Sequence, residues 1–199
     1  MLKTTTLENY NLSNTQIEFL RDSTKERKNI LIAGDIRSGR TSFLNACLNE
    51  LNNEDLRVVT IDDKDELYCP ALNTTKGLIN YEYSTEFLIQ AYSKMRPDYM
   101  ILGEMKTGKE IIEVLKVWNS GHAGMTTIQA VDNGEKLYCF SKLSECMNKI
   151  SDYERNIFPL LIGNTINIVV EIQDKKVQGI KEILGYNEQY KEYAYKTIN

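Results

Sequence analysis

The sequence predicts an α/β fold, with a mixed, mostly parallel sheet and helices on both of its faces. Three observations predict it. Short continuous apolar runs, such as residues 29–33, are typical of strands buried on both faces. Segments with apolar residues at helical spacing alternate with these runs along the chain. The 199 residues contain three prolines and no repeat or low-complexity tract, so we expect a single domain with a substantial core.

The elements follow in order along the chain. Ser13 and Gln16 form a capping-box pattern, which predicts that a helix begins there. A later helix should end at Arg96-Pro97, because proline disfavours helical geometry in the residue before it. The predicted helices span residues 13–28, 41–51, 84–95, 108–120, about 134–149 and 152–161. The predicted strands span residues 29–33, 56–61, 99–102 and 125–130, followed by an antiparallel hairpin from residues 165–172 and 177–186. Within the 1–199 domain, we thus expect a leading helical segment at 1–28 and antiparallel strands in 165–199.

Composition excludes several function classes. The net charge is −4, so no global field favours nucleic acid or acidic lipid. No apolar run approaches the ~18 residues of a membrane span, and the start "MLKTTTLENY" lacks a signal-peptide core. No two of the four cysteines form a CxxC pair, which predicts reduced thiols in a cytoplasmic protein.

The stretch "AGDIRSGRTS", residues 33–42, has the spacing of a phosphate-binding loop. Gly34 and Gly39 are separated by four residues and followed by a basic residue and Thr41. A buried strand precedes the stretch and a helix follows it, as such loops require. Thr41 would offer its hydroxyl to Mg²⁺. The alternative is a tight strand–helix turn with chance spacing. The candidate nucleotide-binding residues here are Gly34, Asp35, Ile36, Arg37, Ser38, Gly39, Arg40, Thr41 and Ser42.

Two arginines depart from the usual loop pattern. Arg40 stands where lysine is usual, and its broad planar guanidinium differs from a compact ammonium. Each lost charge-assisted contact would cost about 1.5–3 kcal/mol. If Arg37 needs a positive φ, it adds on the order of 1 kcal/mol of strain. Arg37 could instead reach a phosphate itself, and the sequence leaves both interpretations open.

Carboxylates follow two other predicted strands. Asp62, Asp63 and Glu66 come directly after residues 56–61, at the edge of the sheet where ligands bind in open α/β folds. They would orient Mg²⁺ or its waters, or else form a solvated acidic turn. Glu104 follows the 99–102 strand and Gly103. It could polarise water for attack on a γ-phosphate, or help to hold Mg²⁺. The single histidine, His122, is either structural or functional.

Together these motifs resemble one family, the ATPases of conjugation and type IV secretion, and among them the TrbB-like conjugal-transfer ATPases. The resemblance extends from about Leu7 to Tyr186. "RVVTIDDKDEL" is similar to the family's acidic box, "MRPDYMILGEMKTGKE" to its Walker B segment with Glu104 as the catalytic carboxylate, and "WNSGHAGMTTIQA" to its histidine box. The resemblance implies a P-loop NTPase (RecA-like) fold, ATP and Mg²⁺ as cofactors, and a hexameric ring that works with secretion proteins. It places Thr41, Asp62, Asp63 and Glu66 at the metal.

The sequence also departs from the family pattern. Gln129 replaces the histidine that senses the γ-phosphate, and it keeps a hydrogen-bond donor without the possibility of charge. Gln90 and Lys94 stand where relatives often carry arginine, and Lys106-Thr107 replaces an Arg-Gly pair. The family's N-terminal domain of roughly a hundred residues is expected to be absent.

Three functions remain open from the sequence. The first is an ATP-hydrolysing motor domain of a conjugation or type IV secretion apparatus, peripheral at the inner membrane through its partners. The second is a degenerate homologue that binds nucleotide or packs in a ring with little hydrolysis. The third, a small-molecule kinase, has no lid or substrate motif to support it.

Overall fold

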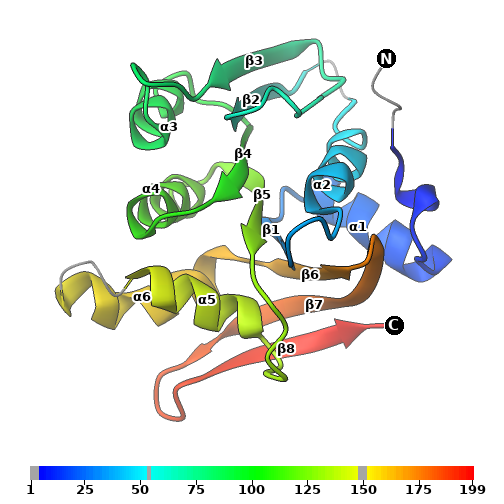
Figure 1. The fold of residues 1–199 in the computed structure, drawn as a ribbon, viewed down its shortest axis with the longest axis vertical. Coiled ribbons are helices and arrows are strands. Elements are labelled where there is room, and N and C mark those ends of the chain that lie inside the picture. Colours follow the sequence, from blue (N-terminus) through cyan, green and yellow to red (C-terminus); the bar gives the residue numbers. More distant parts are fainter. Residues whose placement is uncertain (1–4, 53–54, 148–151) are drawn as a thin grey trace.

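The computed structural model describes residues 5–52, 55–147 and 152–199. Its described strands form one eight-stranded sheet in the order β3-β2-β4-β5-β1-β6-β7-β8 (Figure 1). All neighbours from β3 to β6 are parallel, whereas β7 pairs antiparallel with β6 and with β8. The predicted mixed, mostly parallel sheet is therefore confirmed. The strands are β1 (Ile30–Gly34), β2 (Arg57–Asp62), β3 (Asn73–Leu78), β4 (Tyr99–Met105), β5 (Ala123–Gln129), β6 (Ile168–Gln173), β7 (Lys176–Asn187) and β8 (Glu192–Ile198).

Helices cover both faces of the sheet. Alternate residues of β1 explain the continuous apolar run: Ile30 and Ile32 pack in the core under α1 and α2, while Leu31 and Ala33 pack in the core under α3 to α6. Figure 1 shows these two helical layers on opposite sides of the sheet. The helices are α1 (Asn14–Lys25), α2 (Arg40–Leu48), α3 (Thr85–Ser93), α4 (Gly108–Asn119), α5 (Tyr138–Cys146) and α6 (Asp152–Thr165), with a short 3-10 turn, η1 (Leu7–Asn9).

Local signals set the helix ends. The predicted capping box at the start of α1 is confirmed, because Ser13 accepts from the amide of Gln16 and the Gln16 side chain accepts in return from the Ser13 amide. Thr107 and Glu110 form an equivalent box at the start of α4. The helix α3 ends at Ser93, before the predicted stop. The last residues of the predicted 134–149 helix lie outside the described residues, and its described part, α5, begins at Tyr138.

The end of the chain extends the sheet beyond the parallel core. The predicted hairpin is present, because β6 pairs antiparallel with β7. The same β6 is parallel to β1 on its other side, so it belongs to both parts of the sheet. The turn between β6 and β7 consists of Asp174 and Lys175, both with positive φ, the geometry of a tight two-residue hairpin.

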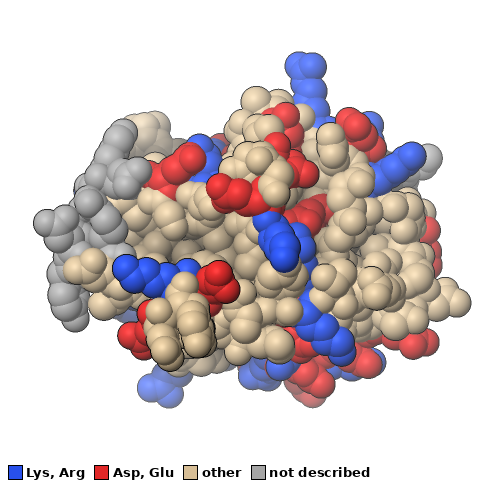
Figure 2. All heavy atoms as spheres, turned by 90° about the horizontal axis from the view of Figure 1, so that it is seen from below, with Lys and Arg blue, Asp and Glu red and all other residues tan. Residues whose placement is uncertain are grey.

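Surface features agree with the composition. Seen from below the view of Figure 1, acidic and basic side chains are interspersed among uncharged surface (Figure 2). Among the residues that the structure describes, no helix combines the length and the apolar character needed to cross a membrane. All four cysteines are free thiols.

Candidate functional site

The candidate phosphate loop, residues 34–41, connects the end of β1 to the start of α2. Gly39 caps α2 with a φ of 97°, and Arg37 has a φ of 63°, so both lie in the left-handed region. Arg37 therefore carries the strain expected of a non-glycine residue there, on the order of 1 kcal/mol. Gly34 also needs its lack of a side chain, because a Cβ would lie 2.3 Å from the carbonyl oxygen of Ile172.

Four donors at the end of this loop have no protein partner within the described part of the chain. The main-chain amides of Gly39, Arg40 and Thr41 precede the first intrahelical hydrogen bond of α2 and donate to no protein acceptor. The hydroxyl of Ser38 is buried and likewise unpartnered. Buried polar groups normally have partners, and converging amides at a helix N-terminus bind anions. The loop therefore has the donor set that a phosphate requires.

Arg40 and Glu104 meet directly. Nη1 of Arg40 lies 2.6 Å from Oε1 of Glu104, and their side chains are 11% and 30% exposed. The Nε of Arg40 is buried without a partner among the described residues. The sequence predicted that Arg40 binds phosphate and that Glu104 is catalytic, and in the structure these two side chains contact each other. In this arrangement the two charges neutralise each other.

A bulge in β4 positions Glu104. The pairing of β4 with β5 shifts register between Leu102 and Met105, and bulges of this kind re-aim a side chain. The hydroxyl of Thr127 on β5 donates to the carbonyl oxygen of Gly103 at 2.8 Å. On the β2 side, a Cβ on Gly103 would lie 2.7 Å from Oδ1 of Asp62. Contacts from both neighbouring strands therefore fix the backbone that carries Glu104.

The acidic residues at and after the end of β2, the strand that pairs with β4, differ in their contacts. The carboxylate of Asp62 accepts from the main-chain amides of Asp63, Glu66 and Leu67 and so closes its own turn. Asp63 pairs with Lys106 at 2.5 Å, and the Lys106 ammonium lowers the pKa of Asp63. The Glu66 side chain is exposed. Within the described residues, no group of three or more such ligands is gathered into a metal cage.

Gln129 lies at the same edge of the sheet. It is the last residue of β5 and pairs in register with Gly34, where the candidate phosphate loop begins. Its side chain is exposed, so its amide is accessible to a ligand bound at the loop. The predicted phosphate, catalytic and γ-phosphate residues therefore share the carboxyl edge of β1, β4 and β5, where open α/β sheets bind their ligands.

Three other residues singled out by the sequence lie elsewhere. His122 precedes β5, at the opposite edge of the sheet from Gln129, and its Nδ1 lies 3.2 Å from the carbonyl oxygen of Val117 at the end of α4. This contact holds the ring of His122 at the end of α4, away from Gln129 and the candidate phosphate loop. Gln90 donates to Glu113 on α4 rather than to the loop. Lys94 caps the end of α3.

The sequence did not indicate two contacts of the site. One is the pairing of Lys106 with Asp63, which joins the end of β4 to the acidic turn. The other is the β6–β7 turn, where the amide of Lys175 donates to the carbonyl oxygen of Ser38 at 2.8 Å. The hairpin was predicted from its apolar runs, but only the order of strands in the sheet brings its turn to the loop.

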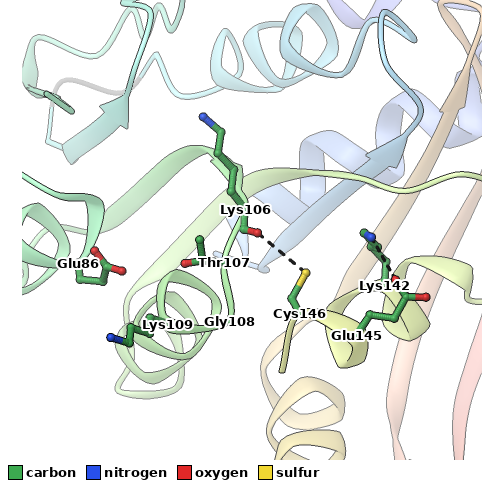
Figure 3. Close-up of a pocket in the computed structure, with 8 residues that line it drawn as sticks. All are labelled: Glu86, Lys106, Thr107, Gly108, Lys109, Lys142, Glu145 and Cys146. Carbon is green, nitrogen blue, oxygen red and sulfur yellow. Dashed lines mark hydrogen bonds and ion pairs between the residues drawn. The ribbon is translucent and has the colours of Figure 1, made fainter. Parts of the chain in front are cut away.

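A hollow borders this site without containing the loop. Its volume is about 500 Å³, it is open to solvent, and it lies beside the start of α4, between α3 and α5. Figure 3 shows that the ammonium of Lys106 points away from Cys146, Lys142 and Glu145 on α5. In this hollow Lys142 pairs with Glu145, and Lys106 pairs with Asp63. We therefore place the candidate site at the loop, on the strength of its unpartnered donors.

Comparison with known proteins gives a consistent result. Residues 3–180 match the family described as "Type II/IV secretion system protein". The chain is 27% identical over 194 residues to the conjugal transfer protein TrbB of Rhizobium radiobacter, covering 94% of this chain and 58% of that protein. It is 30% identical over 173 residues to the type IV secretion system protein VirB11 of Bartonella quintana, covering 82% and 47% respectively.

Solved structures show the same fold. The VirB11 ATPase of Brucella suis, crystallised with sulphate, superposes with a TM-score of 0.72 at 23% identity, over 82% of this chain and 52% of that one. The pilus retraction motor PilT with bound ADP gives a TM-score of 0.70 at 14% identity, over 99% and 53%. The chain thus spans about half the length of the relatives it matches. Because the family match extends over most of its residues, the chain belongs to the type II/IV secretion system protein family.

Proposed function

We propose that this chain is an ATP-binding and ATP-hydrolysing domain that energises a conjugation or type IV secretion apparatus. The observation that carries the proposal is the meeting of the candidate phosphate loop with Glu104 at one sheet edge, through the 2.6 Å contact of Arg40 with Glu104. Family membership supports the motor role, and the sheet order supports the nucleotide edge.

The residues would act as follows. The amides of Gly39, Arg40 and Thr41, with the Ser38 hydroxyl, would hold the phosphates, since they are free donors at a helix N-terminus. Glu104, once released from Arg40, would accept a proton from the attacking water. Arg40 would then stabilise the charge that develops on the phosphate.

Magnesium fits this site as part of the nucleotide complex. Mg²⁺ keeps several waters and usually takes one or two protein oxygens together with substrate phosphates. Thr41 offers a hydroxyl. Asp62, Asp63 and Glu66 form no metal cage of their own among the described residues, so they would act by orienting bound waters. When bound, the ion would neutralise charge on the phosphates.

A second function is favoured by one observation. In the structure, the predicted phosphate cation and the predicted catalytic carboxylate satisfy each other, which would suit a subunit that binds nucleotide in a ring with little turnover. The hexameric assembly and the secretion partners belong to either version of the proposal and rest on family resemblance.

One experiment separates these functions. Binding of MgATP to the purified chain is measured by calorimetry, and phosphate release is followed with and without Mg²⁺. Binding with Mg²⁺-dependent turnover that Glu104→Gln abolishes supports the motor. Binding without turnover supports the degenerate subunit, and sizing with nucleotide then tests ring assembly. A chain that binds no nucleotide would refute both.

A further inference from the structure

The β6–β7 turn touches the candidate phosphate loop through Lys175. Its amide donates to the Ser38 carbonyl oxygen at 2.8 Å. Its side chain lies against Gly39, where an added Cβ would be 3.3 Å from Cγ of Lys175 and 3.4 Å from its Cα. The aliphatic part of the Lys175 side chain therefore begins beside Gly39, the N-cap residue of α2. Because both turn residues have positive φ in a two-residue hairpin, the position of this stem is set by the backbone.

The ammonium of Lys175 is available to a ligand. Its side chain is exposed, and within the described residues it forms no ion pair. Lys181 on the same hairpin differs, since it pairs with Glu171 in a nearly buried contact. A lysine carries three donors on a flexible stem, so an unpaired one beside free loop amides adds positive charge where an anion would bind.

The order of strands determines which part of a nucleotide Lys175 would meet. Glu104 and Gln129 lie on β4 and β5, to one side of β1. Lys175 follows β6, on the other side of β1. If the terminal phosphate faces Glu104, the chain of phosphates leads across the loop towards β6. The phosphates nearer the nucleoside then come beside Lys175.

We propose that Lys175 is a nucleotide-binding residue whose ammonium contacts a non-terminal phosphate, one that ATP and ADP have in common. The inference rests on the proposed function, because it needs a nucleotide on the loop. It adds a residue from the C-terminal hairpin to a site otherwise built from β1, β2, β4 and β5. It also predicts a distinctive signature: the contact does not distinguish ATP from ADP.

The test compares Lys175→Ala with a matched control, Lys176→Ala. The control removes the same charge one residue further along, at the start of β7. Because the hydrogen bond to Ser38 comes from the main chain, Lys175→Ala removes the ammonium and leaves the turn contact in place. Affinities for MgATP and MgADP are measured by calorimetry, and thermal unfolding checks that each variant folds.

We expect Lys175→Ala to weaken binding of both nucleotides by a similar factor, about three- to tenfold, because solvent screens a charged contact made by an exposed side chain and so keeps the loss below that of a buried one. Lys176→Ala should bind like the wild type. Lys175→Arg should restore most of the affinity, and added salt should reduce the difference between wild type and Lys175→Ala.

Three results would overturn the inference. Equal affinities for Lys175→Ala and Lys176→Ala, with a wild type that binds nucleotide, would refute the role of Lys175 and leave the proposed function standing. A loss confined to MgATP would place the contact at the terminal phosphate and refute the assignment made here. A wild-type chain that binds neither nucleotide would overturn the inference together with the proposed function.

Discussion

Replacing Glu104 by glutamine should tighten nucleotide binding while it abolishes turnover. In the structure Arg40 is held by Glu104 at 2.6 Å, so a nucleotide that recruits Arg40 to its phosphates must first separate this pair. Glutamine keeps the size of the side chain and a carbonyl oxygen but loses the charge. Arg40 is then free to turn to the phosphates, and the proposed acceptor of the water proton is gone.

The magnitude follows from the surroundings of the pair. Arg40 is 11% exposed and Glu104 30%, so solvent screens the contact less than it screens a surface ion pair. In Glu104→Gln the charged Arg40 can still donate to the new amide oxygen, so only the attraction between the two charges is lost. Exposed ion pairs contribute about 0.2–1 kcal/mol, and this less screened pair contributes on the order of 1 kcal/mol or slightly more. That energy corresponds to roughly five- to tenfold tighter binding of MgATP.

Calorimetric titration with MgATP measures the affinity, and phosphate release measures turnover. Glu113→Gln is the matched control, because it makes the same change in a carboxylate on α4 that pairs with Lys116. We expect the control to leave affinity and turnover unchanged. Affinity for Glu104→Gln that is equal to or weaker than the wild-type value would refute the competition between Glu104 and phosphate. Turnover that survives in Glu104→Gln would remove Glu104 from the catalytic role.

Three further predictions test other parts of the structure. Arg40→Lys should raise ATP turnover by up to about a hundredfold, if the guanidinium costs ~3 kcal/mol in the transition state; an unchanged rate in a folded variant would contradict this. Gly39→Ala should lower the free energy of unfolding by about 1–2 kcal/mol, because φ is 97° and Lys175 lies against the added Cβ; denaturant unfolding measures it, and wild-type stability would count against the strain. Lys181→Met should destabilise the fold by about 3 kcal/mol near neutral pH by leaving Glu171 unpaired. Burial raises the pKa of Glu171, so this carboxyl group takes up a proton more readily in the folded chain than in the unfolded one. A raised folded pKa gives stability that is present at low pH and lost as pH rises through it, so the loss caused by Lys181→Met should shrink as the pH falls from neutral into the acid range. Urea unfolding at neutral and at acidic pH measures this, and equal losses at the two pH values would refute it.

Much of the fold followed from the sequence because its strands are buried on both faces. The run Ile30–Gly34 is apolar throughout, and every residue in it is buried, so length and composition sufficed to predict a strand. The strand β3 was missed because "NTTKGL" is polar and mostly exposed at the edge of the sheet. Only pairing with β2 makes it a strand, and pairing is not visible in local composition.

The candidate site was predicted only in part, because the sequence shows the local spacing of its residues but not which distant segments meet. Strand–loop–helix spacing placed residues 34–41, and a carboxylate after an apolar run indicated Glu104. Their mutual contact depends on strand order and on the β4 bulge, which the sequence does not reveal. Asp62 was predicted near the metal, and the structure shows its carboxylate closing its own turn. Lys175 was not singled out, because an exposed lysine in a turn has no local signal of function.

The bulge between Leu102 and Met105 makes the segment sensitive to length. Residues 103 and 104 of β4 together oppose the single residue Thr127 of β5, so deleting Gly103 would restore regular pairing and remove the local bend that aims Glu104. Substitutions near Glu104 would change the reactivity of its carboxylate, whereas a deletion would change the direction of its side chain. The proposed reaction therefore depends on the number of residues in the bulge of β4 as well as on the carboxylate of Glu104.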